Sequence, residues 1–107
     1  MTKMSSDNET KRRLKRIAHH LEPVVLVGDQ GVSEALVNEA RRALEDHELI
    51  KVRIHGADRQ QRAILADQLA EACGAAVIQS IGKVTVLFRK NPEPNPKLSN
   101  LERFGGI

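Results

Sequence analysis

The chain has 107 residues, which is enough for one domain with a single hydrophobic core. Hydrophobic residues make up 40% of the chain and charged residues 29%, a balance typical of globular proteins and unlike that of membrane spans. One cysteine and a polar first segment argue against an internal disulfide, a zinc site of several thiolates and a secretory signal. We therefore expect a cytoplasmic protein.

The net charge of +3 conceals an uneven distribution along the chain. Residues 1–20 carry six basic and two acidic side chains, residues 21–50 carry two and seven, and residues 51–107 carry nine and five. If folding brings the two basic segments to one face, that face suits nucleic acid. The ordinary alternative is a solvated surface of mixed charge. Trp and Tyr are absent, so a protein that reads RNA by stacking bases on a row of aromatic rings is not expected.

The first half of the chain predicts a helix, a strand and a second helix. Residues 1–8 are small and polar, and we expect them to be disordered. From about residue 8 to residue 20 apolar side chains recur every three or four positions, which predicts an amphipathic helix with a basic outer face. The β-branched run 24–27 predicts a buried strand. Residues 33–47 predict a second amphipathic helix with Ser33 as its N-cap.

The second half predicts a strand, a third helix and a hairpin. Residues 49–55 alternate, so one side of the strand should join the core while Lys51 and Arg53 face solvent. Residues 58–73 predict a helix that begins with a capping residue and ends before a glycine. Two β-rich runs on either side of Gly82 predict a hairpin.

The element order α-β-α-β-α-β-β predicts an α+β domain of two layers, with a sheet covered mainly on one side by helices. We place this domain over residues 9–90. The sequence NPEPNP at 91–96 cannot form regular secondary structure, so residues 91–107 are expected to be a flexible, proline-containing tail.

The most informative local feature is Gly28-Asp29-Gln30-Gly31, between a predicted strand and a predicted helix. Two glycines permit a sharp turn and the close approach of a ligand, and the next helix offers free N–H groups to a phosphate. KH domains hold single-stranded backbone with a GXXG loop of this kind. A plain turn is the alternative, because four-residue matches are frequent and the Asp29 carboxylate repels phosphate.

The remaining polar residues predict no catalytic or metal site. His19 and His20 are adjacent, so on a helix they point in different directions, and His47 and His55 lack partners at ligand spacing. Cys73 is expected to be a small buried residue at a helix end, with no base near it in the sequence. We therefore expect no enzyme activity, no metal and no cofactor.

Three longer segments carry a more specific pattern: LKRIAHHLEPVVLVGDQGVSE at 14–34, ALEDHELIKV at 43–52 and IGKVTVLFR at 81–89. In order and spacing they resemble the YhbY-like family of CRM-domain RNA-binding proteins, over roughly residues 10–90. The resemblance implies a stand-alone CRM domain with a four-stranded mixed sheet, similar to the C-terminal domain of a translation initiation factor. It also implies association with ribosomal RNA in precursors of the large subunit and a part in ribosome assembly.

The resemblance also indicates which residues contact RNA. The basic first helix and the G-x-x-G loop of the family map onto two segments of this chain, and the alternating strand adds a basic row. The expected RNA-binding residues are Lys11, Arg12, Lys15, Arg16, Gly28, Asp29, Gln30, Gly31, Lys51 and Arg53. Their specificity should come from the shape of the RNA, because aromatic side chains are nearly absent.

The sequence thus predicts a monomeric RNA-binding factor for ribosome assembly, with no membrane and no small-molecule substrate. The first alternative is a protein-interaction module of the translation machinery that uses the acidic helix 33–48. The second is a small enzyme in which Cys73 pairs with a histidine distant in the sequence. Salt-dependent RNA binding distinguishes the RNA-binding factor from the protein-interaction module, and Cys73→Ala tests the enzyme alternative.

Overall fold

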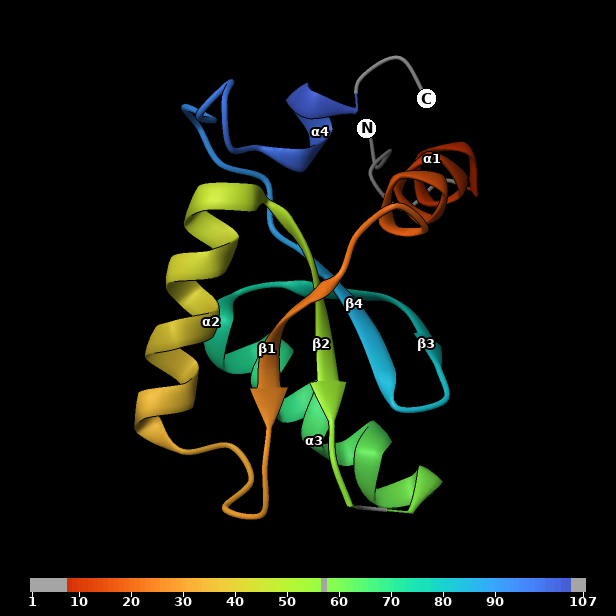
Figure 1. Cartoon of the computed structure of the whole chain (residues 1–107), viewed down its shortest axis with the longest axis vertical. Coiled ribbons are helices and arrows are strands. Elements are labelled where there is room, and N and C mark those ends of the chain that lie inside the picture. The colour runs from red at the N-terminus through yellow and green to blue at the C-terminus, as the bar shows by residue number, and fades with distance from the viewer. Residues whose placement is uncertain (1–7, 57, 105–107) are drawn as a thin grey trace.

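The structure, a computed structural model, describes residues 8–56 and 58–104 of the chain. The elements are α1 (Asn8–Ala18), β1 (Pro23–Val27), α2 (Glu34–His47), β2 (Leu49–Ile54), α3 (Arg59–Cys73), β3 (Ala76–Ile81), β4 (Val84–Phe88) and α4 (Asn100–Arg103). The predicted order is confirmed, and the short α4 follows it (Figure 1). The predicted disorder of residues 1–8 lies outside the described residues, except for Asn8, which begins α1.

The four strands form one mixed sheet in the order β1-β2-β4-β3. The β1 and β2 strands run parallel, whereas β4 runs antiparallel to both β2 and β3. In this register Lys51 lies beside Val86, and Arg53 lies beside Val84. Because paired residues point to the same face of a sheet, the register fixes which side chains share a surface.

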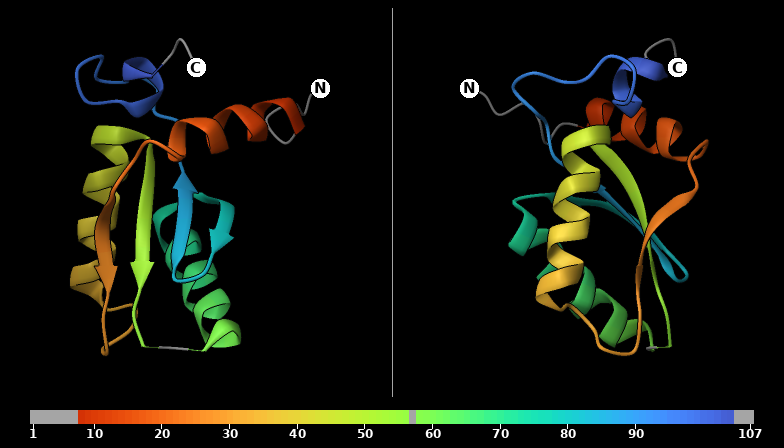
Figure 2. Two further views of the ribbon diagram at one scale, coloured as in Figure 1. Left: turned by 45° about the vertical axis from the view of Figure 1, so that its right-hand side comes forward. Right: turned by 60° about the vertical axis from the view of Figure 1, so that its left-hand side comes forward.

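Helices α2 and α3 cover one face of the sheet, as predicted (Figure 2). The alternating strand β2 sends Ile50, Val52 and Ile54 into this layer, where each is buried. The apolar stripes of the two helices complete the core; the helical residues of this cluster are Leu36, Ala40, Leu44, Ala66, Leu69, Ala70 and Cys73. Burial of these apolar surfaces supplies the main driving force for folding.

Helix α1 covers only one end of the opposite face. Its buried residues Leu14, Ile17 and Ala18 pack in a second cluster with Leu49 and Val86 of the sheet. The helix has 11 residues and ends at Ala18, so the rest of this face has no helix over it (Figure 2). We call this uncovered part the open face of the sheet.

The predicted capping residues of α2 and α3 are confirmed, whereas α1 ends at Ala18, two residues before the predicted end. The Ser33 side chain caps α2 by accepting a hydrogen bond from the backbone N–H of Leu36 at 3.2 Å. Asp58 caps α3 in the same way through the backbone N–H of Gln61 at 2.8 Å. Gly74 ends α3 in the left-handed conformation that favours glycine. Among the described residues no helix is both long and apolar enough to span a membrane.

The prediction of a flexible tail is wrong for residues 91–104, which pack against the domain. Asn91, Ser99 and Asn100 are buried, although all three are polar. The Asn100 side-chain amide donates to the carbonyl oxygen of Leu49 at 2.7 Å, and Leu101 joins the cluster under α1. The prolines exclude long regular structure from this segment, but its side chains still find hydrogen-bond partners on the domain.

Glu48 anchors this C-terminal segment at the turn between α2 and β2. Its side chain is 3% exposed. One carboxylate oxygen accepts a hydrogen bond from the backbone N–H of Asn91 at 2.7 Å, and the other accepts one from the hydroxyl of Ser99 at 2.6 Å. The Asn91 amide donates to the carbonyl oxygens of Leu44 and Glu45 as well. The folded unit therefore extends beyond residue 90.

Candidate nucleic-acid interface

Helix α1 carries the four cations predicted to bind RNA, and all four are exposed. Successive residues of a helix point about 100° apart, so this group cannot share one direction. Lys15 turns toward the open face, where it lines a pocket, and Lys11 lies one turn before it on the same side. Arg12 and Arg16 lie on the side of α1 that points away from the sheet.

Strand β2 carries the second predicted set of cations along the open face. Lys51 is half-buried and Arg53 is exposed, whereas the residues between and beside them are buried in the core, as the alternation predicts. Arg53 lies beside Leu26 on one side and Val84 on the other. The two cations thus form a row in the middle of the sheet.

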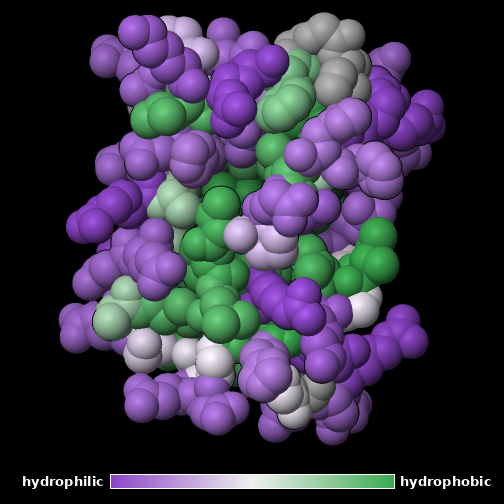
Figure 3. Space-filling view, viewed as in Figure 1, coloured by the Kyte–Doolittle hydropathy of each residue, from purple (hydrophilic) through white to green (hydrophobic). Residues whose placement is uncertain are grey.

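Exposed apolar side chains border this row. Leu26 of β1 is 57% exposed and Ile81 of β3 is 67% exposed. Figure 3 shows hydrophobic surface over β1 and on the β3 side, with hydrophilic side chains between them. A surface that combines cations with small apolar patches can contact both the phosphates and the bases of a nucleic acid.

A pocket lies where α1 meets the open face. Its volume is about 250 Å³. The residues that line it are Lys15, Ala18, His19, Lys51, Gln79, Ile81, Val84 and Val86. The structure therefore brings a cation of α1 and a cation of β2, predicted from distant parts of the sequence, to one place.

The glycine loop lies at the other end of β1 from α1 (Figure 1). The backbone N–H of Gly31 donates to the carbonyl oxygen of Gly28 at 3.0 Å, which closes a tight turn. Gly31 has a φ of +69°, a conformation that side chains rarely tolerate. A Cβ atom at Gly28 would meet nothing within 4 Å, so the loop is open to an approaching backbone.

The glycine loop lines a wide surface pocket of about 390 Å³ together with His55, Gly56, Gln61 and Leu65. None of the described residues that line it is Lys or Arg. Asp29 is exposed, and its carboxylate leans over the turn after β2, where it lies 3.7 Å from the position of a Cβ on Gly56. The loop thus offers space and backbone groups rather than positive charge.

Eight of the ten predicted residues therefore form a track and not a single cluster, whereas Arg12 and Arg16 point away from the sheet. One end of the track is α1, the middle is the pair Lys51 and Arg53, and the far end is the glycine loop (Figure 2). The sequence predicted that Lys51 and Arg53 face solvent, which the burial pattern of β2 confirms, but it did not predict how far α1 lies from the glycine loop.

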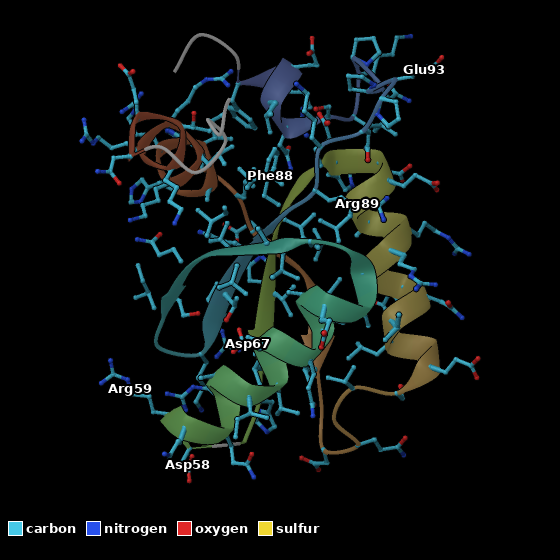
Figure 4. All side chains as sticks on the ribbon, turned by 180° about the vertical axis from the view of Figure 1, so that it is seen from behind. Asp58, Arg59, Asp67, Phe88, Arg89 and Glu93 are labelled. Carbon is cyan, nitrogen blue, oxygen red and sulfur yellow. The ribbon has the colours of Figure 1, made fainter. Side chains whose placement is uncertain are left out.

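Basic residues near the β3–β4 turn were not predicted as site residues. Arg59 and Arg62 of α3 line a pocket of about 430 Å³ with Gly82, whose carbonyl oxygen accepts a hydrogen bond from Arg62 Nε at 3.1 Å. Figure 4 shows Asp58 and Arg59 at the end of the molecule away from α1. The sequence indicated these residues only through the excess of basic over acidic side chains in residues 51–107, and that excess does not show on which face of the sheet each cation lies.

Cys73 has the environment of a structural residue. It is 4% exposed, and its Sγ lies 3.8 Å from the carbonyl oxygen of Val37. Burial raises the pKa of the thiol, an effect that the nearby Arg41 and Arg89 only partly offset. A thiol with a raised pKa is a poor nucleophile near neutral pH. Among the described residues no group of three His, Cys, Asp or Glu side chains is arranged to hold a metal.

Comparison with known proteins gives consistent matches. A model of the CRS1/YhbY (CRM) domain matches residues 7–89. The chain is 46% identical over 104 residues to a Pseudomonas aeruginosa protein named "Probable RNA-binding protein", covering 97% of this chain and all of that one. It is 40% identical over 98 residues to a Haemophilus influenzae protein named "RNA-binding protein", covering 92% and 97% of the two chains.

The fold also matches a solved structure. The solution structure of a hypothetical protein from Staphylococcus aureus superimposes with a TM-score of 0.72 at 31% sequence identity. The match covers 81% of this chain and 91% of the other. The fold of that protein is therefore shared by most of the chain described above.

Proposed function

The chain belongs to the CRS1/YhbY (CRM) domain family, and on that premise we propose that it binds RNA through the open face of its sheet. The RNA we propose is ribosomal RNA in precursors of the large ribosomal subunit, whose assembly the protein assists. We propose that it acts as a monomer in the cytoplasm. Its relatives named as RNA-binding proteins and the cationic open face support this function.

The observation that carries the proposal is the meeting of Lys15 and Lys51 at one pocket on an uncovered sheet face. Each ammonium group that approaches a phosphate releases counterions from the nucleic acid, which favours binding. Arg53 extends the positive row toward the glycine loop. A backbone that follows the track meets cations first and then a loop with no side chain at Gly28 to block it.

We propose a binding protein with no catalytic step. The thiol of Cys73 is the one nucleophile that the sequence suggested, and its burial and raised pKa make it a poor nucleophile near neutral pH. RNA recognition needs only positioning of charge and shape, because A-form helices are recognised mainly through their backbone and 2′-hydroxyl groups.

A titration of structured ribosomal RNA fragments at several salt concentrations tests the proposal. If about five phosphates are contacted, log K should fall against log salt with a slope of about −3.5 to −4.5. Absent or salt-independent binding would contradict RNA binding by this face. Equal affinity for an unrelated structured RNA would contradict the choice of ribosomal RNA while leaving RNA binding intact.

A matched pair of variants connects the binding to the proposed face. Lys15→Glu and Arg42→Glu both reverse one exposed helical cation and change the net charge equally. Lys15 lies at the pocket of the open face, whereas Arg42 lies on α2, which covers the other face. Only Lys15→Glu should weaken binding, by about tenfold, and lower the salt slope by about one.

A further inference from the structure

The pocket between α1 and the open face has the form of a site for one nucleotide. We propose that it holds a single unpaired nucleotide of the bound RNA, with the base inserted among aliphatic side chains and the phosphate near Lys15 and Lys51. This inference rests on the proposed RNA-binding function. It adds a defined pocket for one unpaired base to a surface whose proposed function rests on contacts with the RNA backbone.

The sheet register builds the floor of the pocket from two rows of residues. In one row Val86 lies between Lys51 and Gln79, and in the next row Val84 lies beside Ile81. The apolar residues thus form the floor, while Lys51 and Gln79 provide polar groups on either side. This order of residues is fixed by the pairing of the strands.

The end of α1 forms the remaining wall. Ala18 is the last residue of the helix and is buried, and its small side chain leaves room beside the sheet. His19 follows directly and is exposed at the pocket. Lys15 lies one turn earlier on the same side of the helix. A cation and an imidazole therefore stand over the apolar floor.

The chemistry of these groups matches the parts of a nucleotide. The faces of a base are apolar and can pack on Val84 and Ile81, and the His19 ring can stack on them. The Gln79 amide both donates and accepts hydrogen bonds, as the edge of a base requires. The volume of about 250 Å³ lies just below the range of about 300–1,000 Å³ typical of sites for drug-sized ligands, which suits one base.

The charges of the pocket favour a phosphate-bearing ligand. None of the described residues that line it is acidic. By contrast, the pocket beside α4 contains Glu22, and the pocket at the glycine loop contains Asp29. A base within a duplex is stacked and paired, so it cannot enter a pocket between α1 and the sheet without leaving its helix. The ligand is therefore an unpaired nucleotide.

Three RNA duplexes that share the same paired sequence and have no single-stranded loop test the proposal. The first is fully paired, the second has one additional unpaired adenosine within the duplex, and the third has an abasic site in place of that adenosine. The wild-type chain should bind the second RNA roughly tenfold more tightly than the third. The affinity for the third should remain salt-dependent, because it retains the phosphates.

Two matched variants place the base in this pocket. Ile81→Ser removes an exposed aliphatic side chain from the floor of the pocket, and Ile64→Ser makes the same change at an exposed position on α3. Ile81→Ser should reduce the preference for the intact base to about twofold or less, whereas Ile64→Ser should keep it. In NMR spectra the methyl groups of Val84 and Val86 should shift with the intact base and not with the abasic RNA.

The outcomes separate this inference from the proposed function. Equal affinity of the wild-type chain for the second and third RNAs, with binding still salt-dependent, overturns the nucleotide pocket and leaves RNA binding in place. No binding of any of the three RNAs at low salt overturns both the nucleotide pocket and the proposed RNA-binding function. A preference that survives Ile81→Ser, with no shift of the two valines, places the base elsewhere and overturns the pocket.

Discussion

The two ends of the sheet differ in whether their polar groups are buried and hydrogen-bonded or exposed to solvent. At the end beside α1 and α4, the buried side chains of Glu48, Asn91, Ser99 and Asn100 all make hydrogen bonds. At the other end, the glycine loop has an exposed Asp29 and open space at Gly28. One end is closed by a dense network, and the other leaves backbone free for a partner.

The closed end shows why a carboxylate remains in the interior. Burial of Glu48 costs free energy that its charge-assisted hydrogen bonds offset. Glu48 also has a φ of +62°, unusual for a residue with a side chain, so the turn holds it against local strain. The difference between the ends indicates that buried polar contacts stabilise the fold near Glu48, whereas the backbone is open to close approach near Gly28.

The largest effect should follow from reversing the charge of the α1 end. Lys11, Arg12, Lys15 and Arg16 changed together to Glu should weaken RNA binding at least about 100-fold, because attraction to phosphate becomes repulsion. All four side chains are exposed, so circular dichroism should show an unchanged fold. Near-normal binding by a folded variant would move the RNA site away from α1.

The next largest effect should be on stability, from Glu48→Ala. This change leaves the Asn91 N–H and the Ser99 hydroxyl without their acceptor, and the free energy of unfolding should fall by about 2–4 kcal/mol. Urea denaturation measures it. The control is Glu45→Ala, since the Glu45 side chain is exposed in the last turn of α2, three residues before Glu48. An equal loss of unfolding free energy in both variants would show that the hydrogen bonds of Glu48 contribute little to stability.

Local sequence patterns were sufficient to predict most of the elements. The alternation around Lys51 correctly separated core from surface, and Ser33, Asp58 and Gly74 correctly marked helix ends. These features depend on neighbouring residues, so they can be recognised without knowledge of tertiary packing. The same is true of the cations on the open side of β2.

Long-range packing produced the errors. Asn91 and Ser99 look like solvent-exposed residues in the sequence, and their burial depends on the carboxylate of Glu48, more than 40 residues earlier. The separation of α1 from the glycine loop is a similar case. The five residues of β1, at about 3.3 Å each, span about 16 Å between the end of the strand that follows α1 and the glycine loop. The direction in which α1 crosses the sheet depends on tertiary packing, which no local pattern predicts.

The loop itself permits a finer test, because its two glycines differ. Gly31 has a φ of +69°, so Gly31→Ala strains the backbone, although Leu65 lies at an ordinary contact distance of 3.7 Å from the position of the new Cβ. The free energy of unfolding should fall by about 1–2 kcal/mol. Urea denaturation of Gly31→Ala beside Gly28→Ala measures the difference. A loss confined to Gly28→Ala would reverse the roles assigned to the two positions.

The smallest effect on stability should come from Gly28→Val. This variant is also the most specific test of whether RNA approaches the backbone of the glycine loop. Its new side chain has space in the free protein and does not fall in the left-handed region, so stability should change by less than about 0.5 kcal/mol. A partner that approaches the backbone closely meets the valine, and RNA affinity should fall about three- to tenfold. Because charge is unchanged, the salt slope should stay the same, which distinguishes this steric loss from the loss of a cation at α1. Full RNA affinity in Gly28→Val would mean that the bound RNA extends along the track only as far as Arg53 and does not reach the glycine loop.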